Sequence, residues 1–220
     1  MTAWALSLAA ASALITLLRF AARGPSMAKT VIKTLSVALL ALVSFAEALP
    51  VLLTVALALG ALGDAFLSRD GDATFLGGLG SFALSHIAYT ALFVAMPGFD
   101  AALLTEWPAA PLAVALLLLA VGLGIPLWRA AGALRIPVMI YVVLIVLMGL
   151  SAIAVGAPIL WAAVLFVISD ALLGSKLFLI ARDSRWQNPT DYLVWLSYWV
   201  AQAVFLLGFL MLGLTPATVL

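Results

Sequence analysis

The stretch that decides the fold covers residues 109–128 and reads AAPLAVALLLLAVGLGIPLW, without a single charged side chain. A second stretch of the same kind covers residues 136–155 and reads IPVMIYVVLIVLMGLSAIAV. A helix needs about 20 mainly apolar residues to cross the hydrocarbon core of a bilayer. Each of these stretches therefore predicts a membrane-spanning helix.

Six further apolar stretches flank these two, and charged residues, glycine and proline separate them. Apolar residues make up 67% of the 220-residue chain and charged residues only 9%, whereas about 25% of the residues in a soluble domain are charged. So few charges could not cover a water-facing surface, but lipid can solvate an apolar one. The sequence predicts an all-α fold, a polytopic bundle of about eight transmembrane helices that forms a single transmembrane domain over residues 1–220. The expected helices cover residues 3–22, 29–46, 50–67, 74–95, 109–128, 136–155, 158–181 and 191–213.

The first apolar stretch, residues 4–18, has the length of the apolar core of a signal peptide. Its basic neighbours, Arg19 and Arg23, follow the stretch, whereas a signal peptide carries them in front. We therefore expect this stretch to be retained as the first membrane span.

Basic residues follow a regular pattern along the chain. The even-numbered links between the predicted helices carry only the acids Glu47, Asp100 and Glu106. Because lysine and arginine accumulate in cytoplasmic loops, we expect the odd links in the cytoplasm and both termini outside. The Ala-, Leu- and Gly-rich usage is typical of a GC-rich bacterial genome, so the predicted location is the inner (plasma) membrane of a bacterium. All ten basic residues lie on or near odd-numbered links, at Arg19, Arg23, Lys29, Lys33, Arg69, Arg129, Arg135, Lys176, Arg182 and Arg185.

A weak internal repeat relates the two halves of the chain. Asp64 near the end of the third predicted helix corresponds to Asp170 in the seventh, and His86 in the fourth corresponds to Tyr198 in the eighth. A parallel four-plus-four duplication would explain this correspondence. Chance similarity within an apolar chain of low complexity would explain it as well.

A small set of polar residues lies within the predicted spans, where ionisable side chains are costly and usually mark a functional site. Nearly all of them lie at mid-membrane depth or on the cytoplasmic side of it. A single polar pocket that opens to the cytoplasmic leaflet would satisfy the whole set. Its members are the ionisable Lys33, Asp64, His86, Asp170 and Lys176 and the neutral Tyr89, Tyr141, Ser169, Tyr198 and Gln202.

Each of these residues also has a purely structural interpretation. Asp170 could bond a neighbouring helix, and Asp64 could cap a helix or meet interfacial water. His86 could bridge two helices through hydrogen bonds. Lys33 and Lys176 could extend toward the membrane surface, and the tyrosines could serve packing.

Composition excludes several kinds of site. The chain has no cysteine and a single histidine, which rules out disulfides, thiolate metal sites and multi-histidine metal sites. The net charge of +1 gives no electrostatic footprint for nucleic acid. No glycine-rich phosphate loop follows a strand, and no Gly-x-Ser-x-Gly turn occurs. We expect no metal, no cofactor and no nucleic-acid partner, and the oligomeric state stays open.

Four short motifs follow one another along the chain: Gly63-Asp64-Ala65-Phe66-Leu67, then Ser85-His86-Ile87-Ala88-Tyr89, then Ser169-Asp170 with Lys176, then Tyr198 with Gln202. In this order they resemble the YhhN family, which includes the lysoplasmalogenases, integral membrane hydrolases with eight predicted spans. The resemblance covers nearly the whole chain. It implies hydrolysis of the vinyl-ether bond of a lysophospholipid taken from the bilayer, which yields a fatty aldehyde and a glycerophospho-alcohol.

The implied reaction suggests roles for the polar residues. Vinyl ethers hydrolyse after protonation of the β-carbon, so the site needs a general acid and a carboxylate that stabilises positive charge. Asp170 is the favoured acid, because removal from water disfavours the charged form of a carboxyl group. Asp64 would stabilise the cation or activate water, although the two aspartates could exchange roles, and His86 would act as base or orient a carboxylate. The expected substrate-binding residues are Lys33 and Lys176 near the lipid phosphate, Tyr198 and Gln202 near the ether oxygen or the water, and Tyr89, Tyr141 and Ser169.

A transporter or channel for protons or a small solute is the competing hypothesis. Chains of intramembrane Asp and His residues build proton relays, and four-plus-four repeats occur in transporters. The ionisable residues gather toward one side of the predicted bundle, however, and leave the outer half with few polar groups. This distribution favours a pocket closed at one end, and therefore an enzyme. A structural scaffold would leave the intramembrane Asp and His residues unexplained.

Overall fold

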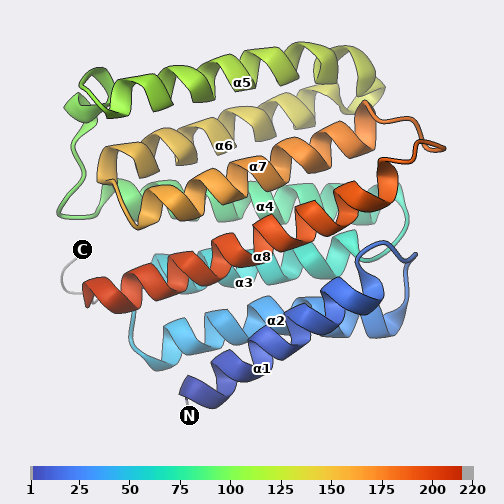
Figure 1. The fold of residues 1–220 in the computed structure, drawn as a ribbon, viewed down its shortest axis with the longest axis horizontal. Helices are drawn as coiled ribbons and strands as arrows, with labels where there is room; N and C mark the ends of the chain where they lie inside the picture. Colours follow the sequence, from blue (N-terminus) through green and yellow to red (C-terminus); the bar gives the residue numbers. More distant parts are fainter. Residues whose placement is uncertain (1, 215–220) are drawn as a thin grey trace.

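Eight α-helices lie side by side along one long axis in the part of the chain that the computed structural model describes, residues 2–214 (Figure 1). A π-helical segment, η1 (Thr16–Phe20), continues α1, and the short 3-10 segments η2 (Ala101–Thr105) and η3 (Gly132–Leu134) lie in links between helices. The helices are α1 (Thr2–Ile15), α2 (Met27–Ala46), α3 (Val51–Leu67), α4 (Asp72–Val94), α5 (Ala109–Ala130), α6 (Arg135–Val155), α7 (Ile159–Phe178) and α8 (Gln187–Leu212).

The predicted all-α membrane bundle is confirmed. Seven of the helices found within residues 2–214 are long and apolar enough to cross a membrane, and the exception is α3, with 17 residues. This length is at the lower limit for a span, about 17–25 residues. The largest difference from the expected boundaries is at α8, which begins at Gln187 rather than at residue 191. Its first turn is polar, so hydropathy alone does not detect it. The predicted internal repeat stays a prediction.

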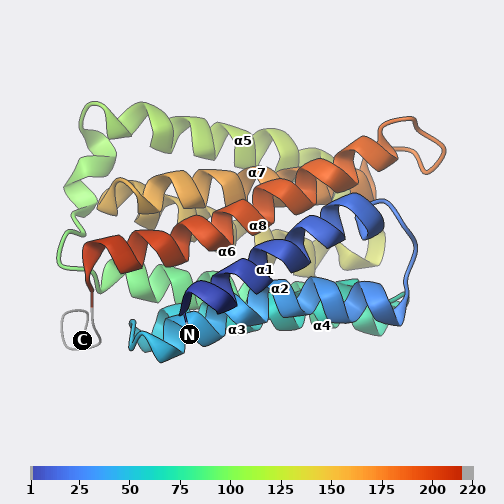
Figure 2. The same ribbon diagram turned by 60° about the horizontal axis from the view of Figure 1, so that its bottom comes forward.

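The helices are arranged with α1 and α5 at the two edges of the bundle (Figures 1 and 2). α1 packs against α2, and α5 packs mainly against α6. The middle consists of the closely packed pairs α3–α4 and α7–α8, and α6 lies against α4. Segments that are distant in sequence therefore meet in the centre of the bundle.

The core and the outer surface are both apolar, as expected for a protein surrounded by lipid. The rings of Tyr89 and Phe205 are completely buried and stack with their centroids 4.4 Å apart. Large apolar side chains also cover the outside, where Leu118 is 68% exposed and Ile140 is 56% exposed. A soluble monomer rarely exposes so much contiguous apolar surface, whereas lipid chains solvate it readily.

Charges divide between the two ends of the bundle. The links at residues 21–26, 68–71, 131–134 and 179–186 lie at one end, on the right in Figure 1. We call this end the basic end, because these links and the helix turns next to them carry the basic residues. The links with Glu47, Asp100 and Glu106 lie at the opposite end. The alternation read from the sequence is therefore a real division in space, and its orientation across the membrane stays a prediction.

Glycines allow α3 and α4 to approach closely. A Cβ atom on Gly63 of α3 would lie 2.6 Å from Cε2 of Phe82 on α4, and a Cβ atom on Gly78 would lie 2.5 Å from Cδ2 of Leu67. The hydroxyl of Ser85 on α4 donates to the carbonyl of Ala56 on α3, at 2.8 Å. Small residues and hydroxyl groups are the usual means by which membrane helices pack closely.

Gly63→Ala is expected to destabilise the protein by about 1–3 kcal/mol, the usual cost of overpacking a filled interior. The new methyl group would force the ring of Phe82 out of its position between α3 and α4. The midpoint of thermal unfolding in detergent measures the loss. Gly80→Ala on α4 is the matched control, because a Cβ atom there meets nothing within 4 Å, and equal midpoints for both variants would contradict the packing assignment.

Candidate active site

Asp64 on α3 is the more deeply buried of the two aspartates that the sequence placed within spans. The expectation that Asp170 lies further from water than Asp64 is therefore wrong, and removal from water does not distinguish Asp170 as the acid. Its side chain is 1% exposed, and the ammonium of Lys33 on α2 lies 3.0 Å from Oδ1. The hydroxyl of Tyr198 on α8 donates to Oδ2 at 2.9 Å. Lys33 also lies over the ring of Trp195, 5.4 Å from its centroid. Asp64 is thus satisfied by a counter-ion and a hydroxyl from two other helices.

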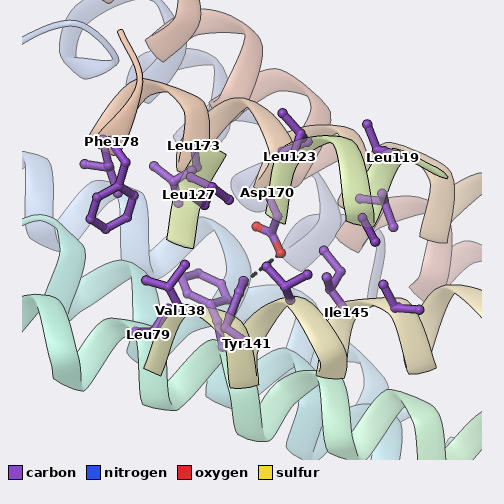
Figure 3. Close-up of a pocket in the computed structure, with 18 of the residues that line it drawn as sticks. Leu79, Leu119, Leu123, Leu127, Val138, Tyr141, Ile145, Asp170, Leu173 and Phe178 are labelled. Carbon is purple, nitrogen blue, oxygen red and sulfur yellow. Dashed lines mark hydrogen bonds between the residues drawn. The ribbon is translucent and has the colours of Figure 1, made fainter. Parts of the chain in front are cut away.

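Asp170 on α7 has a different set of partners. The hydroxyl of Tyr141 on α6 donates to Oδ2 at 2.7 Å, and Nε2 of His86 on α4 lies 3.0 Å from the same oxygen. Nε2 also lies 3.1 Å from the Tyr141 hydroxyl oxygen, which closes a triangle of polar atoms. Figure 3 shows Asp170 and Tyr141 pointing toward one another among apolar side chains. Among the described residues, no lysine or arginine forms a salt bridge with Asp170.

The imidazole of His86 is completely buried. Within residues 2–214, its Nδ1 atom has no hydrogen-bond partner. A protonated imidazole would bury an unpaired N–H donor at this position, at a cost of about 1–3 kcal/mol or more. Nε2 is therefore the ring nitrogen that contacts the polar groups, and it is placed to donate a hydrogen bond to Asp170.

The two aspartate clusters use corresponding helices. Asp64 on α3 receives its partners from α2 and α8, and Asp170 on α7 receives them from α6 and α4. In the predicted four-plus-four correspondence, α2 pairs with α6, α3 with α7 and α8 with α4. The partners differ in chemistry, however, since only Asp64 has a lysine. The clusters are therefore similar in position and different in charge.

A polar cavity of about 520 Å³ reaches from the basic end toward the middle of the bundle. Both aspartates line it, so both are within reach of water that enters there. The sequence predicted one polar pocket for ten residues, and the cavity includes six of them: Lys33, Asp64, Ser169, Asp170, Lys176 and Tyr198.

An apolar groove between α4, α5, α6 and α7 meets this cavity (Figure 3). Leucine and valine side chains make up most of its wall, and Tyr141 and Asp170 are its only polar side chains. Its volume is about 90 Å³, which is room for about three groups of the size of a water molecule. Six residues line both spaces, and Asp170 is the only polar one among them; the others are Leu67, Phe75, Phe82, Leu173 and Leu177.

Four predicted site residues do not line the polar cavity. His86 and Tyr141 reach it only through Asp170. Tyr89 and Gln202 are completely buried, and the hydroxyl of Tyr89 donates to Oε1 of Gln202 at 2.5 Å. Within residues 2–214, Nε2 of Gln202 is buried without a hydrogen-bond partner. They stay predictions as substrate-binding residues.

Two predicted residues that line the cavity are engaged with α8. The hydroxyl of Ser169 donates to the carbonyl of Val194 at 3.0 Å. Lys176 forms an ion pair with Asp191. Asp191 and Trp195 also line the cavity, and neither was among the site residues predicted from the sequence. Their spacing with Tyr198, at positions 191, 195 and 198, places all three on one face of a helix and could have identified them.

Family comparison agrees with the resemblance noted in the motifs. The model of the YhhN family matches residues 28–209. The chain belongs to the YhhN family. The match extends from α2 into the last turns of α8 and includes every residue of both aspartate clusters. The YhhN family includes the lysoplasmalogenases. Searches among curated proteins and among solved structures gave no significant match.

Lys33→Met is expected to destabilise the protein, because it leaves the carboxylate of Asp64 buried without its counter-ion. Removing one partner of a buried pair costs about 3–5 kcal/mol, and the loss here should be smaller because Lys33 is 18% exposed. Denaturation in detergent measures it.

The double variant Lys33→Met with Asp64→Asn tests the cause. The amide retains an oxygen that can accept from Tyr198 but carries no charge, so this variant should recover part of the lost stability. A double variant less stable than Lys33→Met alone would show that charge burial is not the reason.

Proposed function

We propose that this YhhN protein is a membrane-embedded hydrolase that cleaves the vinyl-ether bond of lysophospholipids. The products would be a fatty aldehyde and a glycerophospho-alcohol. One observation carries the proposal: Asp170 is the single polar side chain shared by a water-accessible polar cavity and an apolar groove. An amphiphile that occupies both spaces places the bond between its apolar chain and its polar head beside this carboxyl group.

The shape of the two spaces suits a single-chain lipid. The small groove takes the few carbons next to the vinyl ether, and the rest of the chain extends along the lipid-facing surface of α5. The larger polar cavity takes the glycerol part, with the head group toward the basic end. We propose that this end faces the cytoplasm, so that the lipid comes from the cytoplasmic leaflet.

The reaction starts with the carboxyl proton of Asp170. Transfer of this proton to the β-carbon of the vinyl ether leaves an oxocarbenium ion and an aspartate anion. The hydroxyl of Tyr141 and the Nε2–H group of His86 already point at that anion. Donors that are in place before charge develops stabilise the transition state without reorganisation.

Water from the polar cavity completes the hydrolysis. It adds to the oxocarbenium carbon and returns one proton to Asp170, which acts as base in this step. The hemiacetal then collapses into the aldehyde and the free hydroxyl of the glycerophospho-alcohol. One water molecule is consumed, and the side chains end in their starting protonation states.

The two aspartates take different roles in this scheme. Asp64 forms an ion pair with the ammonium of Lys33 at 3.0 Å, and we assign it to stabilise positive charge in the cavity. Asp170 has only neutral donors around it, and its side chain is 10% exposed. Its position at the junction of the two spaces, beside the bond to be cleaved, is the reason for assigning Asp170 as the acid.

The competing transporter hypothesis requires a route to the opposite end of the bundle. All residues that line the polar cavity lie in the half of the bundle toward the basic end or near its middle. Beyond them, the completely buried rings of Tyr89, Phe93 and Phe205 pack against one another. This packing supports a site that opens at one end only, as an enzyme for a membrane lipid needs.

Asp170→Asn is expected to reduce aldehyde formation by about 10²–10⁴-fold, the usual contribution of a general acid. Purified protein is incubated in detergent with a vinyl-ether lysophospholipid, and free aldehyde is followed over time. The acyl and saturated alkyl analogues and the two-chain plasmalogen serve as substrate controls. Asp183→Asn is the matched variant control, because this exposed carboxylate lies in the link between α7 and α8.

Full activity in a folded Asp170→Asn protein would eliminate the proposed acid. If the folded wild-type protein releases no aldehyde at all, the hydrolase proposal fails. Proton flux measurements on Asp64, His86 and Asp170 variants in vesicles would then test the transporter hypothesis.

A further inference from the structure

The polar cavity is lined by more cations than the proposed reaction uses. Two of them are already neutralised, because Lys33 pairs with Asp64 and Lys176 pairs with Asp191. Each pair brings no net charge to the cavity. Four other cations line the cavity and form no salt bridge with a described carboxylate: Arg23, Lys29, Arg69 and Arg182.

These four cations come from three separate links that meet at the basic end. Lys29 lies in the first turn of α2 and donates to the carbonyl of Arg23, at 2.5 Å. Arg69 follows α3, where its guanidinium contacts the sulfur of Met27 at 2.9 Å. Arg182 lies in the link after α7. None of these contacts supplies negative charge, so the cations remain available to an anion.

We infer that Lys29, Arg69 and Arg182 form a phosphate-binding site at the mouth of the polar cavity. That the bound molecule is a lysophospholipid rests on the proposed function. That the cations bind a phosphate group follows from their charge and does not depend on that function. Guanidinium groups bind phosphate oxygens in bidentate fashion, and a lysine adds a point charge. Asp70 and Asp72 also line the cavity, so the four cations exceed these two carboxylates by two charges.

The depth of this site fits the position of Asp170. Six bonds separate the ether-bearing vinyl carbon of a lysophospholipid from its phosphorus, which is on the order of 7 Å in an extended chain. Asp170 lies six residues before Lys176 on α7, about 9 Å along the helix axis. Lys29 lies one helical turn beyond Lys33 toward the basic end, about 6 Å. With the vinyl ether at Asp170 and the head group toward the basic end, the phosphate therefore ends about 2 Å short of the axial level of Lys176. The long side chains of the unpaired cations that line the same cavity would have to extend toward it.

Binding of lipids that cannot be cleaved tests the site independently of catalysis. The probes are a saturated alkyl lysophospholipid and the matching alkylglycerol, which lacks the phosphate. Tryptophan fluorescence can report binding, because Trp195 lines the cavity. Lys29→Gln, Arg69→Gln and Arg182→Gln are combined in one variant. The matched control combines Arg129→Gln, Arg135→Gln and Arg185→Gln. These substitutions remove the same amount of charge, and the three arginines line neither the cavity nor the groove.

The cavity variant should bind the alkyl lysophospholipid at least tenfold more weakly, with a smaller dependence on salt, and should bind alkylglycerol as before. The control variant should bind both probes as the wild type does. Equal weakening of both probes by the cavity variant, or wild-type affinity for the phosphate probe, would overturn the inference. If inorganic phosphate displaces the lipid, the site binds free phosphate as well. If inorganic phosphate does not displace it, the site binds only phosphate that is carried by a lipid. Absence of aldehyde release with vinyl-ether lipid would count against the proposed function and leave this result standing.

Discussion

A carboxyl group at membrane depth is costly to bury, so it needs partners within the protein even where a polar cavity reaches it. This constraint explains how the centre of the bundle is organised. Asp64 brings α2 and α8 to α3, and Asp170 brings α4 and α6 to α7. Apolar packing alone distinguishes poorly between neighbouring helices, since lipid is as apolar as the side chains that it contacts. The two aspartates therefore link α3 to α2 and α8, and α7 to α4 and α6.

The same constraint separates the two aspartates chemically. A lysine satisfies Asp64, so its charge is compensated in the resting protein. The hydroxyl of Tyr141 and Nε2 of His86 contact Asp170, which has no lysine or arginine partner among the described residues. The proposal for a hydrolase depends on this contrast and on the place of Asp170 between an apolar and a polar space. The family match over residues 28–209 shows that the chain belongs to the YhhN family.

Much of the fold could be predicted from the sequence, and much of the site could not. Apolar runs and the links between them predicted the helices, and the spacing of basic residues predicted the division of charge between the ends. The partners were out of reach, because Tyr89 and Gln202 are 113 positions apart and His86 and Asp170 are 84 apart. Which side chains meet depends on how helices rotate and pack, which hydropathy does not record. Cations near the links, such as Arg69, were predicted only as markers of the cytoplasmic side, because hydropathy does not reveal the cavity beside them.

In the proposed reaction, the protein delivers a proton to the β-carbon of the vinyl ether before the ether bond breaks. Hydrolysis of the vinyl-ether lysophospholipid in D₂O, with immediate trapping of the aldehyde, tests it directly. Authentic aldehyde kept in D₂O for the same time corrects for exchange. Mass spectrometry should find one deuterium on carbon 2 of the aldehyde, the former β-carbon. Aldehyde without deuterium at carbon 2 would mean that the bond breaks by another route, and Asp170 would then not be the acid that protonates this carbon.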